Sequence, residues 1–193
     1  LAEKTSPVPT AYSGKHIDAV DAGKVLFGGF TPKNEHKGGL AVSGLQERVY
    51  TGMAEDLANI QLLPYAKELL GDWAFASIAV DAAQDGDYTI AIQVAAKTAC
   101  QMGMLVDGQV YPLTYEKGNG YYQLLKQTVS LTKGTHYITF TAAMPADDNH
   151  LEGNAWDIYP WTNLASIVVD QGLRVLGAPS LEAVTDKLQT YTP

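Results

Sequence analysis

The chain has 193 residues, a formal net charge of −8, 46% hydrophobic residues and 18% charged residues. A chain of that length can form one domain with a full hydrophobic core and an additional segment, and it is too short for two domains that each have such a core. The 13 basic residues are scattered along the chain, which disfavours nucleic acid and favours a neutral or cationic partner, because phosphate binding rests on clustered Lys and Arg. No apolar run approaches the roughly 20 residues that cross a bilayer, so we expect no membrane anchor.

The N-terminal segment and the cysteine content restrict the context of the protein. Residues 1–16 carry two prolines and several small polar residues, which predicts a linker or an extended arm outside the core. The sequence begins at Leu1 rather than at Met, so we expect a processed product or a module of a longer protein. Cys100 is the single cysteine, which excludes an internal disulfide and a multi-cysteine metal site.

A helical pattern precedes the main run of strands. In residues 52–72 the apolar side chains follow helical spacing and the stretch ends Glu-Leu-Leu-Gly. We therefore expect one or two short helices, interrupted near Pro64. A second helical pattern lies at residues 180–189, where a serine in the N-cap position opens a C-terminal helix or the entry to a following domain.

From Ala74 onward the sequence predicts short β-strands at close spacing. They are expected at residues 74–80, 87–96, 101–106, 109–114, 124–131, 136–143 and 163–170. In the second of these, every other residue from Tyr88 to Val94 is large and apolar, which is typical of a half-buried strand. Asp107-Gly108 is the kind of pair favoured in two-residue hairpin turns. Because no helices alternate with these strands, the expected fold class is all-β, an antiparallel β-sandwich.

Two adjacent tyrosines follow a Gly-Asn-Gly sequence and raise a question about exposure. Neighbouring side chains on a strand point to opposite faces, so only one of the two can lie in the core. Tyr121 shares the parity of Leu125 on the apolar face, which predicts that Tyr122 is the exposed one. A bulge at Gln123 or Leu124 would exchange the faces and leave Tyr121 free to stack on a ligand.

The segment of residues 144–162 lacks secondary-structure periodicity, and loops this long are uncommon unless they are functional. The candidate ligand-binding side chains in and just after it are Trp156, Asp157, Tyr159, Trp161 and Asn163. Aromatic rings offer apolar contact to the C–H faces of sugars, while Asn and Asp fix the hydroxyl groups. The alternatives are tryptophans that cap the core, and an acidic loop that binds calcium or performs acid–base catalysis.

The sequence gives little indication of a catalytic or metal-binding site elsewhere. Neither a Gly-x-Ser-x-Gly nor a His-Glu-x-x-His signature occurs in the sequence. The four histidines, His16, His36, His136 and His150, show no ligand spacing. We expect these side chains to be exposed or incidental.

The order of several motifs resembles carbohydrate-binding modules of families 6 and 35. The stretches that carry the resemblance lie within residues 72–170 and are "AVDAAQDGDYTIAIQVAA", "LVDGQ", "YYQLLKQTVSLTKGTHYITFTAA" and "NLASIVV". Two earlier stretches, "IDAVDA" and "GGLAVSGL", are also similar to motifs of these families. The resemblance implies a galactose-binding-like jelly roll over residues 17–176. The helical stretch at 46–72 would then be an insertion, and residues 177–193 a C-terminal linker or helix.

The resemblance also implies site residues. Asn163 falls on the asparagine that binds ligand in these families, and Tyr121 can stand in for the stacking aromatic after a small loop shift. The families hold a structural calcium with acids of the first strand and of the closing motif. Asp18 keeps one of these acids, whereas Val20 and Ala165 replace two others, which leaves too few charged oxygens for the ion.

The function expected from these observations is that of a noncatalytic carbohydrate-binding module in a secreted or cell-surface bacterial multidomain protein. It would bind an oligosaccharide or polysaccharide through Tyr121, the Trp156 to Trp161 loop and Asn163, by stacking and hydrogen bonds. The alternative is a structural accessory β-sandwich that packs against a neighbouring catalytic domain and binds no ligand.

Overall fold

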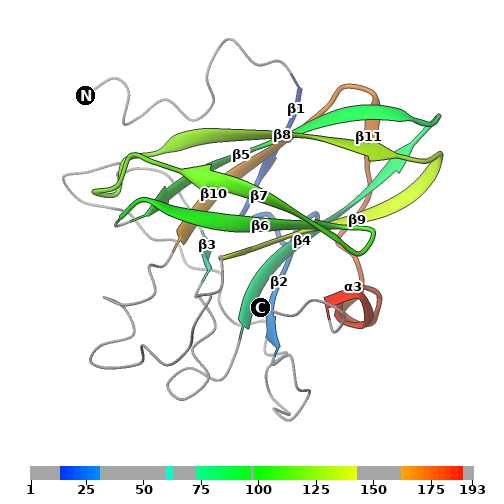
Figure 1. The fold of residues 1–193 in the computed structure, drawn as a ribbon. Helices are drawn as coiled ribbons and strands as arrows, with labels where there is room; N and C mark the ends of the chain where they lie inside the picture. Colours follow the sequence, from blue (N-terminus) through cyan, green and yellow to red (C-terminus); the bar gives the residue numbers. More distant parts are fainter. Residues whose placement is uncertain (1–13, 31–59, 63–72, 97, 143–161, 189–193) are drawn as a thin grey trace.

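The computed structural model describes residues 14–30, 60–62, 73–96, 98–142 and 162–188, which form two antiparallel sheets that face each other (Figure 1). One sheet contains, in spatial order, β1 (Lys15–Asp18), β10 (Thr162–Val169), β5 (Gly86–Ala96) and β8 (Gln123–Leu131), with β3 (Ile60–Leu62) also paired to β10. The other contains β11 (Leu173–Val175), β4 (Trp73–Ala82), β9 (Gly134–Ala142), β6 (Cys100–Val106) and β7 (Gln109–Tyr115), with β2 (Leu26–Phe30) also paired to β4. The expected all-β antiparallel sandwich is confirmed.

The apolar core lies between the two sheets. On β5, Ile90, Ile92 and Val94 are at most 1% exposed and belong to the main apolar cluster. The opposite face of this strand is buried as well, with Ala91 at 1% and Gln93 at 3% exposure. The expectation that β5 is only half-buried is therefore wrong, because a period of two shows which residues share a face but not how that face is covered.

The open edges of the sandwich are bridged by side chains that reach from one sheet to the backbone of the other. Lys15 Nζ on β1 donates to the carbonyl oxygen of Leu173 on β11 at 2.7 Å. Gln127 Nε2 on β8 donates to the carbonyl oxygen of Pro112 on β7 at 3.2 Å. These bonds satisfy edge carbonyls that would otherwise be open to pairing with another chain.

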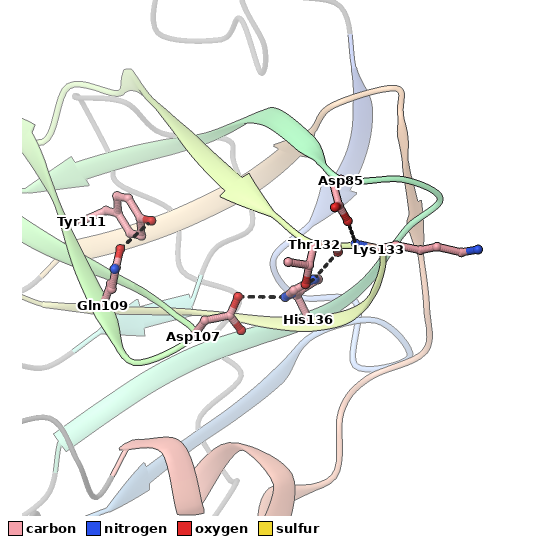
Figure 2. A network of polar contacts seen from close by, with 7 residues as sticks. All are labelled: Asp85, Asp107, Gln109, Tyr111, Thr132, Lys133 and His136. Carbon is pink, nitrogen blue, oxygen red and sulfur yellow. Dashed lines mark hydrogen bonds and ion pairs between the residues drawn. The ribbon is translucent and has the colours of Figure 1, made fainter.

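Three turns meet at one end of the sandwich (Figure 2): the β6–β7 hairpin, and the β4–β5 and β8–β9 turns, each of which leads from one sheet to the other. A buried histidine joins the β6–β7 and β8–β9 turns. Nδ1 of His136 lies 2.9 Å from Oδ2 of Asp107 in the β6–β7 turn, where Asp107 and Gly108 have the positive φ angles of 51° and 79° that the hairpin requires. Nε2 of His136 lies 2.6 Å from the carbonyl oxygen of Thr132, and the amide of Lys133 donates to Asp85 Oδ1 at 2.7 Å. His136 is 6% exposed, so the expectation of an exposed or incidental side chain is wrong for this histidine.

Replacing His136 by leucine is expected to lower the free energy of unfolding by about 1–3 kcal/mol, because the contacts of its ring with the Thr132 carbonyl and the Asp107 carboxylate are both lost. Leucine keeps much of the apolar bulk of the ring, so packing should change little. Urea denaturation of the two proteins measures the difference. The matched control is Tyr111→Phe, which removes an exposed hydroxyl 3.0 Å from Gln109 Oε1 and should cost less than about 0.5 kcal/mol. Equal stability of His136→Leu and the wild type would show that His136 does not stabilise the turns that it joins.

The helical expectations have different outcomes. Residues 60–62, placed inside the expected helices of the 46–72 insertion, form strand β3 and pair with Thr162, Asn163 and Leu164 of β10. The helix prediction is wrong there, because an unpaired stretch of β10 offers backbone hydrogen bonds that override local helical spacing; the rest of 46–72 lies outside the described residues. The C-terminal helix is confirmed as α3 (Leu181–Leu188), with Ser180 Oγ accepting the Ala183 amide at 3.3 Å. No helix in the described ranges is long and apolar enough to cross a membrane.

Candidate functional site

The candidate site lies at the end of the sandwich opposite the β4–β5, β6–β7 and β8–β9 turns. Strands β5 and β7 end there, and β8 and β10 begin there, as their antiparallel pairing requires (Figure 1). The loop of residues 116–122 between β7 and β8 and the first residues of β10 bring together Tyr121, Tyr122 and Asn163. Two of these three, Tyr121 and Asn163, were predicted from the sequence to bind ligand.

The 116–122 loop is fixed by its backbone conformation and by hydrogen bonds at both of its ends. Gly118, Asn119 and Gly120 have φ angles of 74°, 56° and 73°, and a run of three such angles is accessible chiefly to Gly and Asn. The Gly120 amide donates to the Ala96 carbonyl at 2.9 Å, which extends the pairing of β5 beyond the first residue of β8. At the N-terminal end of the loop, Gln123 Oε1 accepts hydrogen bonds from the Glu116 amide at 2.9 Å and the Lys117 amide at 3.4 Å.

Tyr115 is a buried residue that sequence reasoning missed. It is the last residue of β7, its ring is 0% exposed, and its hydroxyl lies 2.7 Å from the carbonyl oxygen of Tyr121. The carbonyl oxygens of Ala96 and Gly118 each lie 3.2 Å from the same hydroxyl. Burial raises the pKa of Tyr115, so the hydroxyl keeps its proton and remains a donor at neutral pH. Strand parity could have placed Tyr115 in the core, but nothing in the sequence pointed to its loop contacts.

The exposure of the two tyrosines reverses the expectation from parity. Tyr121 is 40% exposed and Tyr122 is 7% exposed. Tyr122 lies on the outer face of the five-stranded sheet, as parity requires, but it is packed there against Ala95 and Ala165. The bulge that would exchange the faces is absent from the described pairing of β8 with β5, which runs without a register shift from Gln123. Strand alternation does not predict the exposure of Tyr121, because Tyr121 precedes the strand and belongs to the loop.

Asn163 is the most unusual polar residue of the site. It pairs with Ala95 of β5 and Gln61 of β3, and its side chain is 0% exposed. Within the described residues, neither Oδ1 nor Nδ2 of Asn163 has a hydrogen-bond partner. A buried amide left without partners costs free energy in the folded state and needs an explanation. A bound ligand that supplies both a donor and an acceptor is one such explanation.

Asn163 shares its face of the sheet with the Tyr122 cluster. It lies two residues before Ala165 on β10 and opposite Ala95 on β5, and both alanines contact Tyr122. The exposed ring of Tyr121 follows in the adjoining loop. The site therefore combines one accessible aromatic ring, one apolar cluster and one amide with unused hydrogen-bonding capacity.

Cys100 and Thr162 lie on the core side of this end of the sandwich. Burial raises the pKa of the Cys100 thiol, and the neighbouring Thr162 hydroxyl partly offsets that effect. A thiol with a raised pKa stays protonated and is a poor nucleophile. Cys100 therefore contributes packing to the site rather than reactivity.

The residues that would hold the family calcium do not fit the ion. Asp18 Oδ1 lies 2.8 Å from His16 Nε2, and the Asp18 side chain is 69% exposed. Val20 packs against the apolar core, and Ala165 belongs to the Tyr122 cluster. Across the described ranges there is no group of three or more His, Cys, Asp or Glu side chains placed to hold a metal. A calcium ion, which requires several oxygen ligands, has no donor set here.

The remaining predicted site residues lie outside the described residues. These are Trp156, Asp157, Tyr159 and Trp161, all within the segment of residues 143–161. Their assignment to the site remains a prediction. By sequence, the segment ends one residue before Thr162 and so leads directly into Asn163.

Comparison with known proteins identifies the fold. Neither the family models nor the curated proteins that were compared with the sequence give a match. Among solved structures, the chain is similar to the CBM35 of Abf62 from Cellvibrio japonicus, with 19% identity and a TM-score of 0.51 over 86% of this chain and 100% of that chain. The fold is thus that of a family 35 carbohydrate-binding module, which confirms the expected resemblance to that family.

Two further similarities have lower scores. A family 35 carbohydrate-binding module from an environmental isolate is 20% identical, with a TM-score of 0.43 over 55% of this chain and 72% of that chain. An exo-β-1,3-galactanase from Phanerochaete chrysosporium is 15% identical, with a TM-score of 0.49 over 82% of this chain and 29% of that chain. Identities of this size concern the fold of the chain and do not identify a ligand.

Proposed function

We propose that this chain is a noncatalytic module that binds a neutral saccharide at the end of the sandwich formed by the 116–122 loop and the start of β10. The observation that carries the proposal is the fully buried amide of Asn163, whose two polar atoms have no partner within the described residues. The 40% exposed ring of Tyr121 in the adjoining loop supplies an apolar surface. Trp156, Asp157, Tyr159 and Trp161 are proposed as further contacts.

A pair of neighbouring sugar hydroxyls matches the chemistry of this amide. Each hydroxyl can donate one hydrogen bond and accept others, so one can donate to Oδ1 of Asn163 while the other accepts from Nδ2. The C–H face of the same ring can stack on an aromatic side chain such as Tyr121. Because the chain carries a net charge of −8, an anionic polysaccharide is disfavoured and a neutral one is favoured.

The wider context is part of the same proposal. We infer a secreted or cell-surface bacterial protein in which this module accompanies a glycan-active domain, since the sequence motifs and the fold resemble modules of that kind. Affinity for a single saccharide should be weak, because a site with one exposed ring buries little of the ligand.

Titration calorimetry with neutral trisaccharides tests the proposal. The panel contains xylotriose, mannotriose, a β-1,3-linked galactotriose and isomaltotriose. Tyr121→Ala should weaken binding of the preferred trisaccharide by about 2- to 10-fold, since stacking on an aromatic ring contributes roughly 0.5–1.5 kcal/mol. The matched control is Val110→Ala, which truncates the other exposed large apolar side chain of the described ranges, 45% exposed at the opposite end of β7. Equal affinity of Tyr121→Ala and the wild type would remove this ring from the site.

A structural accessory β-sandwich remains the second candidate function. The observation that favours it is the 0% exposure of Asn163, since a ligand must first reach that amide. In this case no saccharide of the panel should bind to the wild type, and deleting the module from a longer protein should destabilise the neighbouring domain. Binding of any trisaccharide that is lost in Tyr121→Ala decides against it.

A further inference from the structure

We propose that Tyr115 is a positioning residue of the saccharide site, which fixes the Tyr121 loop against the strands that carry Asn163. This inference rests on the proposed function, because it assigns to a buried residue the geometry of that site. Tyr115 is itself 0% exposed and cannot touch a ligand. It acts through its hydroxyl, which lies where the loop meets the end of β5.

The hydroxyl of Tyr115 faces three backbone carbonyls from two separate segments. Its shortest contact is the donation to the Tyr121 carbonyl at 2.7 Å, while the carbonyls of Gly118 and Ala96 lie at 3.2 Å. A phenol has one hydrogen to donate, so the bond to Tyr121 dominates and the other two carbonyls share the hydrogen weakly. The hydrogen bond therefore acts on the residue whose ring is exposed.

The same hydroxyl connects the loop to the strand beside Asn163. Ala96 is the register partner of Thr162, and Ala95 is the register partner of Asn163. The carbonyl of Ala96 also accepts the Gly120 amide at 2.9 Å. Because Gly120 and Tyr121 are adjacent, the backbone of the loop is held to β5 through the Gly120 amide and to β7 through the Tyr121 carbonyl. The position of the Tyr121 ring relative to the Asn163 amide is set by these bonds.

Holding the loop in advance has a consequence for affinity. A loop that becomes ordered only on binding loses conformational freedom at that moment, and this cost is subtracted from the affinity. The loop is also held at its N-terminal end, where Gln123 Oε1 accepts hydrogen bonds from the amides of Glu116 and Lys117. If the hydroxyl of Tyr115 is removed, the hydrogen bonds of Gln123 at the start of the loop remain. The increase in backbone mobility is then confined to the residues next to Tyr121.

The test compares two tyrosines that differ in position but not in chemistry. Tyr115→Phe removes the hydroxyl described above. Tyr88→Phe removes a hydroxyl that donates to the Gln84 carbonyl at 2.6 Å, from a ring 7% exposed at the opposite end of the sandwich. Both variants keep their rings and should lose similar stability in urea denaturation. Titration with the neutral trisaccharide panel should show affinity lowered about 3- to 10-fold in Tyr115→Phe, as expected for one lost hydrogen bond, and unchanged in Tyr88→Phe.

A second measurement works without a ligand. Hydrogen exchange of the Gly120 and Tyr121 amides, read by NMR, should be at least tenfold faster in Tyr115→Phe than in the wild type and unchanged in Tyr88→Phe. The positioning role is overturned if exchange at these two amides is unchanged in Tyr115→Phe, or if a saccharide binds the wild type and this variant equally well. If no saccharide of the panel binds the wild type, the proposed function fails, and amide exchange still shows whether Tyr115 holds the loop.

Discussion

Replacing Asn163 by leucine is expected to raise the free energy of unfolding by about 1–3 kcal/mol and to lower saccharide affinity at least tenfold. The two side chains have nearly the same shape, so the core should accommodate the change. The folded protein no longer buries an amide (0% exposed) that has no hydrogen-bond partner among the described residues, whereas the complex loses both hydrogen bonds proposed for the sugar hydroxyls. A gain in stability at the expense of function is typical of residues kept for binding.

The control for this experiment lies on the same strand and, because the register with β5 shifts between Leu164 and Ser166, on the same face. Ser166 Oγ donates to Gln93 Oε1 at 3.1 Å and the serine is 2% exposed, so Ser166→Ala removes a buried polar group that has a partner. This variant should lower stability by about 0.5–1.5 kcal/mol. Urea denaturation should therefore give opposite signs for the two substitutions. If Asn163→Leu loses as much stability as Ser166→Ala, the amide has partners in the folded chain and the argument for a ligand fails.

The contrast between these two residues shows what the sequence can and cannot reveal about the site. The closing motif predicts that Asn163 belongs to a binding region, and the strand pattern predicts that it lies on β10. Its missing partners depend on which groups β5 and β3 bring beside it, at Ala95 and Gln61. Such contacts join residues about 70 to 100 positions apart in the chain, and no local pattern encodes them.

The two tyrosines make the same point at the start of a strand. Alternation predicts faces only while the backbone is extended, and β8 begins at Gln123, after both tyrosines. The Gly-Asn-Gly sequence marks the loop, since its three residues adopt positive φ angles. What it could not signal is that Tyr115 would reach across and bind the Tyr121 carbonyl. The apolar alternation of β5, by contrast, predicted its core face correctly, because burial between two sheets follows directly from that pattern.

Replacing Ile167 by alanine is expected to have the opposite effects to Asn163→Leu, although both residues lie on β10. Ile167 is 0% exposed, faces the core, and pairs with Ile92 of β5 and Ile17 of β1. Removing three carbon atoms there should lower the free energy of unfolding by about 2–5 kcal/mol through lost burial and the cavity left behind. A domain of this size has roughly 5–15 kcal/mol in total, so the variant should still fold at low temperature.

Saccharide affinity of Ile167→Ala should equal that of the wild type when both are measured at a temperature where urea denaturation shows the variant to be folded. The graded control is Ile167→Val, expected to cost only about 0.5–1.5 kcal/mol. The physical reason for the separation is that the two faces of β10 serve different purposes: the inner face supplies packing, and the outer face carries the Asn163 amide, which has no partner in the described part of the chain. If affinity falls in step with stability across Ile167→Val and Ile167→Ala, binding depends on the core as a whole rather than on the outer face, and the assignment of the site to that face is wrong.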